Sequence, residues 1–130
     1  CEREVRFSQP IGLLDAHEGE WRSVILTGCK IDFLSLRGAR VEDVLVTGCT
    51  IGELDLTGAT VSRVRLADTR VGTLEAHDLR SEHLDLRGAE FDRVGGFASL
   101  RGALVTPDQV ARWAPALAEA LGLRVVEDVS

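Results

Sequence analysis

Residues 31–60 read IDFLSLRGAR, VEDVLVTGCT and IGELDLTGAT, three blocks of ten that align without an insertion. Cut before Leu34, the run divides into groups of five. The first residue of a five is Ala, Cys, Thr, Val or Leu, and the third is almost always Leu, Ile, Val or Phe. The same register holds from Val24 to Arg93, which makes fourteen consecutive fives. An internal repeat this regular determines the architecture.

A period of five excludes both an α-helix and a flat strand. The pattern drifts around a helix with 3.6 residues per turn, and it breaks the alternation that a strand requires. It fits a short extended segment followed by a corner, with positions one and three pointing inward, position two pointing outward, and positions four and five turning the chain. Four such sides close a coil of twenty residues, and coils stack about 4.8 Å apart. Glycine at position five suits such a corner, and it is found at Gly28, Gly38, Gly48, Gly58 and Gly88.

The repeats resemble those of the pentapeptide repeat family. The closest fives are LDLTG at 54–58, LDLRG at 84–88 and AEFDR at 89–93, and the resemblance covers residues 14–94. It implies an all-β fold, a right-handed quadrilateral β-helix, here of about four coils. Position two is often Arg, Thr or Lys where the family prefers Asp or Asn. A leucine-rich repeat has a longer period with an Asn or Cys ladder and a helical return, which this sequence lacks.

The inward side chains predict how the column is stabilised. A coil covers its aliphatic residues only when the next coil stacks on it, so a charge at Ile51 or Leu56 should disrupt the column locally. Trp21 falls on an inward position three and is expected in the core. Cys29 and Cys49 are twenty residues apart at position one, where parallel side chains favour apolar packing over a disulfide.

Three segments are expected: a lead-in or cap over residues 1–13, the β-helix over 14–104, and a C-terminal helix and tail over 105–130. Thr106 is the predicted N-cap, with Pro107 at the first helical position and Gln109 completing a capping box. Pro115 predicts a kink or two short helices. Gly122 predicts the end of the helix.

The C-terminal segment has two interpretations. Apolar residues recur at helical spacing, at Val110, Trp113, Leu117 and Leu121. They suit either a cap on the last coil, which shields its edge, or a homodimer contact, which the family resemblance implies because several members dimerise through C-terminal segments. Residues 123–129 are available to add a strand in either case.

Composition and net charge exclude or disfavour several classes of protein. A net charge of −6 disfavours direct nucleic-acid binding, which uses basic patches. No run is long and apolar enough for a membrane span, and the first residues do not resemble a signal peptide. The two inward cysteines are expected to be reduced. These features favour a cytoplasmic protein that does not bind membranes.

The sequence predicts no enzyme, no cofactor and no metal site. Coil register places His17 and His77 on one side but about 14 Å apart, and His83 lies beyond a corner. No motif sets a nucleophile beside a base, and no Gly-rich phosphate loop follows a strand.

Charged side chains are distributed unequally over the four sides of the predicted column. The side formed by 14–18, 34–38, 54–58 and 74–78, here called the acidic side, sets five carboxylates against Arg37 alone, a formal charge of −4. The five are Asp15, Glu18, Asp55, Glu75 and Asp78. The side containing Arg65 and Arg87 is neutral. Within the acidic side, position two should form one vertical row of Asp15, Ser35, Asp55 and Glu75.

Three functions remain open at this point. The first is a non-catalytic interaction module whose protein partner the sequence does not identify. The second comes from the family resemblance, which implies a DNA mimic that presents carboxylates in place of phosphates to DNA gyrase or a related type II topoisomerase. The third is a structural subunit of a larger assembly. The acidic side also has a plain interpretation as a solubilising surface.

Overall fold

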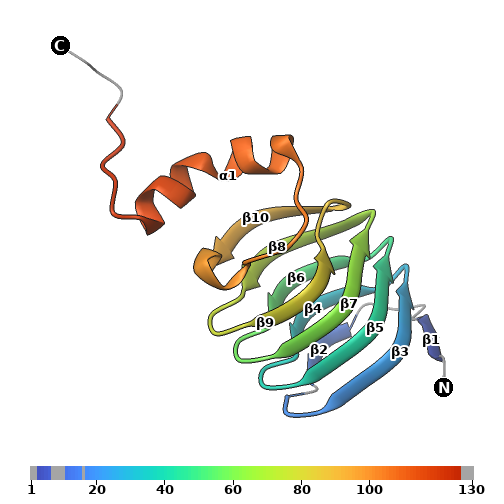
Figure 1. Cartoon of the computed structure of the whole chain (residues 1–130). Coiled ribbons are helices and arrows are strands. Elements are labelled where there is room, and N and C mark those ends of the chain that lie inside the picture. Colours follow the sequence, from blue (N-terminus) through green and yellow to red (C-terminus); the bar gives the residue numbers. More distant parts are fainter. Residues whose placement is uncertain (1–2, 7–10, 16, 127–130) are drawn as a thin grey trace.

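The computed structural model describes residues 3–6, 11–15 and 17–126 of the chain. Within these ranges ten strands are followed by a short 3₁₀ helix, η1 (Phe97–Ser99), and one α-helix, α1 (Pro107–Ala120), as Figure 1 shows. The strands are β1 (Arg3–Arg6), β2 (Ile11–Asp15), β3 (Glu20–Thr27), β4 (Lys30–Ser35), β5 (Arg40–Thr47), β6 (Thr50–Asp55), β7 (Thr60–Ala67), β8 (Thr69–Glu75), β9 (Arg80–Asp85) and β10 (Ala89–Gly95).

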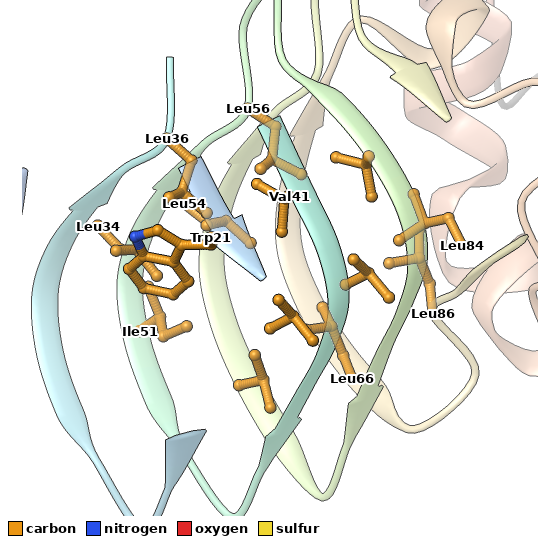
Figure 2. A pocket seen from close by; sticks show the side chains of 14 residues that line it. Trp21, Leu34, Leu36, Val41, Ile51, Leu54, Leu56, Leu66, Leu84 and Leu86 are labelled. Atoms are coloured by element: carbon orange, nitrogen blue, oxygen red, sulfur yellow. The ribbon is translucent and has the colours of Figure 1, made fainter. Parts of the chain in front are cut away.

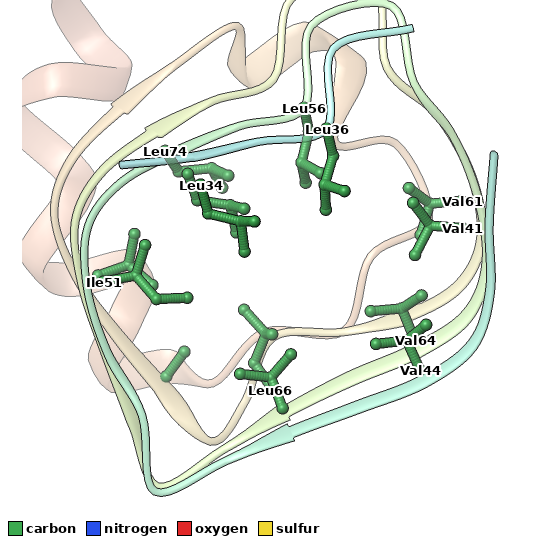
Figure 3. Packing of buried hydrophobic residues seen from close by; sticks show 14 of the residues in the cluster. Leu34, Leu36, Val41, Val44, Ile51, Leu56, Val61, Val64, Leu66 and Leu74 are labelled. Atoms are coloured by element: carbon green, nitrogen blue, oxygen red, sulfur yellow. The ribbon is translucent and has the colours of Figure 1, made fainter. Parts of the chain in front are cut away.

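The strands form two parallel sheets that face each other. One sheet has the order β1-β3-β5-β7-β9 and the other β10-β8-β6-β4-β2. From β2 onward each residue pairs with the one twenty positions away, so that Leu54 lies between Leu34 and Leu74, whereas β1 pairs with β3 at a spacing of twenty-one. Viewed along the column in Figure 3, the coils have a four-sided outline and equivalent side chains lie over one another. The predicted β-helix of about four coils with a C-terminal helix is confirmed.

The inward pattern of the sequence matches the core. Every position-one residue from Val24 to Ala89 is buried, and so is every position-three residue from Leu26 to Phe91 except the half-buried Ser81. Burial of one such aliphatic side chain contributes about 1.5–3 kcal/mol. Figure 2 shows the lining side chains pointing into the interior, where they leave an apolar cavity of about 30 Å³. Trp21 is half-buried and packs against this core, as expected.

Three of the four corners in a coil use left-handed backbone. Gly38 and Gly58 occupy one corner with φ of 68° and 67°, and their N–H groups donate to carbonyls of the next coil. Gly28 and Gly48 occupy another corner with φ of 63° and 65°. The fourth corner is a bend within continuous strands β4, β6 and β8, where no residue has positive φ.

Gly88 was predicted to provide backbone angles that a side chain resists, and this prediction was wrong. Gly88 does not have positive φ. A Cβ at Gly88 would instead lie 2.7 Å from the Leu66 carbonyl oxygen and 2.7 Å from Ala67 Cα. Glycine is therefore suited to this position because the neighbouring coil approaches closely.

Cys29, Cys49 and Thr69 form a column of buried side-chain donors. The Cys49 thiol donates to the carbonyls of Leu26 and Thr47 at 3.5 and 3.4 Å. One coil further, the Thr69 hydroxyl donates to the equivalent carbonyls of Val46 and Ala67. Both cysteines are buried thiols and not a disulfide, as predicted.

The coil arrangement extends further toward the N-terminus than expected. Strand β1 pairs with β3 from Arg3 onward, and β2 pairs with β4, so both strands belong to the first coil. Strand β1 lies wholly before residue 14, where the β-helix was expected to begin, and β2 starts before it. Residues 7–10, part of the predicted lead-in, lie outside the described residues.

Helix α1 begins and ends where the sequence predicts. Thr106 and Gln109 form the capping box. At the other end Gly122 has φ of 81°, and the N–H groups of Gly122 and Leu123 donate to Glu119 and Ala118 in a Schellman arrangement. The expectation of two short helices was wrong, because α1 continues through Pro115. In the described residues no helix is long and apolar enough to cross a membrane.

Substitution of Ile51 by Asp tests coil stacking. Ile51 is 1% exposed between Ile31 and Val71, so an unpaired carboxylate there should lower the free energy of unfolding by more than about 4 kcal/mol. Thr50→Asp is the matched control, because Thr50 is the exposed preceding residue of the same strand. Urea unfolding followed by far-UV circular dichroism measures both, and equal losses would contradict the stacking argument.

Candidate interaction surfaces

The acidic side contains the predicted row of stacked residues. Strand pairing places Asp15 beside Ser35, Ser35 beside Asp55, and Asp55 beside Glu75. Their exposure differs, however. Asp15 is exposed and Glu75 is half-buried, whereas Asp55 is only 6% exposed. The expectation that position two points freely into solvent was therefore wrong at Asp55 and at Ser35, which is also buried.

Asp55 is occupied by contacts within the chain. Its Oδ1 accepts a hydrogen bond from the Thr57 N–H at 3.0 Å, and its Oδ2 accepts one from Arg37 Nε at 3.2 Å. Burial raises the pKa of Asp55, but the hydrogen bonds from Thr57 and the Arg37 guanidinium lower it by more, so the pKa lies below its ordinary value. The carboxylate closes a corner and neutralises the one cation of this side.

The same corner contact recurs along the column. Asp15 accepts from the His17 N–H and Asp85 from the Arg87 N–H, each at 3.0 Å and each two residues along the chain. An Asp side chain that binds the backbone two residues on stabilises a turn. Aspartate at position two therefore has a structural role at these three corners. The sequence analysis did not predict this role, although each of these Asp residues is followed two positions later by a polar residue.

Both histidines of the acidic side pair with its carboxylates. His17 Nδ1 lies 2.8 Å from Asp15 Oδ1, and His77 Nδ1 lies 3.1 Å from Glu75 Oε2. The hydrogen bond to Asp15 raises the pKa of His17. Glu18 and Asp78 are the remaining carboxylates of the set, and both are exposed at left-handed corner positions. In the ranges that the structure describes, no group of three His, Cys, Asp or Glu side chains is arranged to hold a metal ion.

The first half of α1 closes the C-terminal end of the column. Gln109 Nε2 donates to the carbonyls of Leu86 and Ala89 at 2.6 and 2.7 Å. Its Oε1 accepts from the Thr106 N–H at 2.8 Å. Trp113 is buried, with its ring centroid 5.8 Å from that of Phe91 and 5.9 Å from that of Phe97. Gln109 and Trp113 thus act as a cap on the last coil, as one of the two interpretations predicted.

The predicted apolar stripe divides into two parts. Trp113 and the partly buried Leu117 pack on the column, and they continue a stripe that begins at Gln109. Val110 and Leu121, expected in the same stripe, are instead 43% and 78% exposed. The buried stripe therefore runs through Gln109, Trp113 and Leu117, at i, i+4 and i+8. Because it begins at a polar residue, a search for apolar residues at helical spacing did not identify it.

The chain continues from α1 into an exposed apolar stretch, residues 121–126, here called the tail. It leaves the column in Figure 1 and contains no strand. Its four apolar side chains are between 61% and 78% exposed: Leu121, Leu123, Val125 and Val126. Residues 123–126 of the stretch that was available to add a strand form no strand within this chain, and residues 127–129 lie outside the described part.

One wall carries a shallow groove. Its volume is about 370 Å³, and its lining residues are Ser23, Ile25, Asp43, Val44, Leu45, Arg63 and Arg65. Ile25 and Leu45 are partly exposed neighbours in β3 and β5, and Arg65 follows them in β7. This surface, called the Ile25–Leu45 groove below, lies on the side that is neutral in the sequence.

No family model matches the chain, and no curated protein matches it.

The role of Asp55 predicts an acid dependence of stability. Because its folded pKa is lowered, its contribution is present above the unfolded pKa near 3.9 and is lost as pH falls through the folded value. Asp55→Asn should therefore be less stable than the parent chain at pH 7, with a difference that shrinks below about pH 4. Urea unfolding at pH 7, 5 and 3 measures it, with the exposed Asp92→Asn as control. A constant difference at all three values would contradict the assignment.

Replacement of Gln109 by Met tests the cap. Met has a similar shape but leaves the carbonyls of Leu86 and Ala89 without their donor, which should cost about 1–3 kcal/mol of unfolding free energy. Val110→Ser, one residue further and exposed, should change stability by less than about 0.5 kcal/mol. Thermal unfolding of both variants distinguishes a cap from a helix that merely follows the column.

Proposed function

We propose that this chain is a non-catalytic interaction module of the pentapeptide repeat type, and that its protein partner is a second copy of the same chain. The observation that carries the proposal is the tail, in which four large apolar side chains are between 61% and 78% exposed. Contiguous exposed apolar surface of this kind marks an interaction site. The tail follows directly on a helix whose first half is anchored to the column, so it starts from the C-terminal end of the column (Figure 1).

The charge of residues 105–126 favours a second copy as partner. The whole chain carries −6, which opposes self-association through most of its surface. Over residues 105–126 the charges cancel, because Asp108 and Glu119 are balanced by Arg112 and Arg124. Two copies that meet through residues 105–126 bring apolar side chains together without net repulsion between these residues, although Glu127 and Asp128 follow in the sequence.

A DNA mimic that binds DNA gyrase or a related type II topoisomerase is the alternative function. Its support is the formal charge of −4 on the acidic side together with the family resemblance. Asp15 and Asp55 already close corners, and Glu75 already faces His77. The mimic would therefore present Glu18 and Asp78, a smaller set than the five. A structural subunit of a larger assembly is a third role that the same exposed tail would serve.

We place this module in the cytoplasm. The support is the pair Cys29 and Cys49, which are buried thiols in adjacent coils, since such thiols persist in reducing compartments.

The oligomeric state tests the proposed function. A variant with Ser in place of Leu121, Leu123, Val125 and Val126 should be monomeric, whereas the parent chain should be dimeric, in light scattering after size exclusion at about 50 µM. The melting temperature should hold within about 2 °C, because these side chains are exposed. Leu13→Ser is the matched control, since Leu13 is 62% exposed at the opposite end of the column and should leave the dimer intact. A monomeric parent chain or a dimeric tail variant would refute the proposal.

The same proteins separate the alternative. A DNA mimic should inhibit gyrase supercoiling in a salt-sensitive manner, should retain that inhibition in the tail variant, and should lose it in Glu18→Gln/Asp78→Asn. These two carboxylates are the informative ones, because Asp55→Asn also weakens a corner.

A further inference from the structure

We propose that the acidic side carries two half-sites for zinc, one at His17 and one at His77, and that a second copy of the chain completes each of them. This inference goes beyond the proposed function, because it concerns a wall of the column and not the tail. The expectation that the two histidines share no metal within one chain is unchanged, and no three-ligand group occurs among the described residues. Each chain alone therefore holds only half of a site.

The first and fourth coils of the acidic side carry nearly the same five residues. Residues 14–18 read LDAHE and residues 74–78 read LEAHD, so each five has a histidine at position four and carboxylates at positions two and five. Neither coil between them has a histidine on this side. Because the fives stack in register, His17 and His77 lie in one column, three coil spacings or about 14 Å apart.

Each histidine is oriented by a carboxylate in the way that is usual for a metal ligand. His17 Nδ1 lies 2.8 Å from Asp15 Oδ1, and His77 Nδ1 lies 3.1 Å from Glu75 Oε2. An ionised carboxylate only accepts hydrogen bonds, so Nδ1 is the donor and Nε2 of the neutral ring carries the lone pair. Metal-binding histidines commonly donate their other ring nitrogen to a carboxylate in this manner.

The coordinating atoms of both half-sites are available at the surface. The side chains of His17 and His77 are exposed, and among the described residues neither Nε2 makes a hydrogen bond. One residue further along the chain, Glu18 and Asp78 are exposed, and their carboxylates make no contact of this kind within the same ranges. Two half-sites together supply two imidazoles and two carboxylates, a set of four ligands that zinc binds in tetrahedral geometry.

A two-fold axis can bring the half-sites of two copies together. An axis that lies between two acidic sides, parallel to their strands, sets the first coil of one copy against the fourth coil of the other. His17 of each copy then faces His77 of the other copy. Both sites have the same composition, as a closed two-fold pair requires.

Charge favours this antiparallel pair over a parallel one. If the two columns ran parallel with their histidines in contact, Arg37 would face Arg37 of the second copy, whereas the antiparallel pair sets it opposite Thr57. The acidic side carries a formal charge of −4, so two such sides repel each other in the absence of cations. Two zinc ions supply +4 against the combined −8. The association should therefore depend on the metal.

Sedimentation equilibrium with and without zinc tests the site. The tail variant, in which Ser replaces Leu121, Leu123, Val125 and Val126, should be monomeric in EDTA. At about 50 µM protein and about pH 8, one equivalent of ZnCl2 should convert it to a dimer with two zinc ions, measured by equilibrium dialysis. A mass that zinc does not change would refute the inference.

Histidine substitutions identify the ligands. His17→Asn and His77→Asn should each weaken the zinc-dependent dimer at least tenfold in Kd, because either substitution removes an imidazole from both sites. Two controls should stay within twofold: His83→Asn, the third and also exposed histidine, and Leu45→Ser in the Ile25–Leu45 groove on another wall. Melting temperatures verify folding. An equal loss in His83→Asn, or no loss in His17→Asn, would show that zinc binds elsewhere.

A mixture of two variants tests the orientation of the pair. In the antiparallel pair, a His17→Asn chain and a His77→Asn chain together retain one site with two histidines, so an equimolar mixture should dimerise with one zinc ion. Each variant alone should not dimerise. In a parallel pair each variant alone would keep one two-histidine site, and that result would overturn the predicted alignment.

The outcomes separate this inference from the proposed function. If the parent chain is dimeric in EDTA, and zinc changes the mass of neither the parent chain nor the tail variant, the inference is wrong while the function stands. If the parent chain is monomeric in EDTA and dimerises in zinc only with His17 and His77 intact, the proposed function is wrong while the inference stands. If both hold, zinc should raise the mass of the parent chain beyond that of a dimer.

Discussion

Every feature of this protein depends on the contact between one coil and the next. A single turn of twenty residues places its aliphatic side chains inward but cannot cover them, and the next turn both covers them and receives the backbone hydrogen bonds of the first. The register of Leu34, Leu54 and Leu74 is the visible result. Because burial and backbone pairing act along the same axis, the walls are free to vary in charge without affecting the core, and the two ends become the places where the fold needs additional residues.

The C-terminal end shows how such an end is closed. Gln109 supplies donors to two carbonyls that a further coil would otherwise have satisfied, and Trp113 covers the aromatic rings of Phe91 and Phe97. Together they replace the missing coil with one polar and one apolar contact. The helix that carries them has more length than the cap requires, and the remainder leads into the exposed tail. Closure of the column and presentation of the tail are thus achieved by one element.

The fold was predictable from the sequence because inward positions require small or aliphatic side chains. Fourteen consecutive repeats make this requirement easy to recognise in the sequence. The candidate surfaces were less predictable because outward positions admit several roles. Asp55 has the composition of a surface carboxylate, yet its contact with the Thr57 N–H depends on a corner geometry that composition does not report. Likewise, Gln109 is polar and therefore fell outside an apolar stripe, although it occupies the most buried point of the helix along with Trp113.

The twenty-residue register also limits how such a chain can change in length. Insertion or loss of a whole coil leaves each later side chain on its original wall, only displaced along the axis by one strand spacing. A change of five residues preserves the core, since inward residues still fall inward, but it rotates everything after it by a quarter turn. Arg65 would then leave the row of Ile25 and Leu45 for an adjoining wall. Length variation among chains built this way can therefore redistribute surface chemistry in discrete steps while the interior stays unchanged.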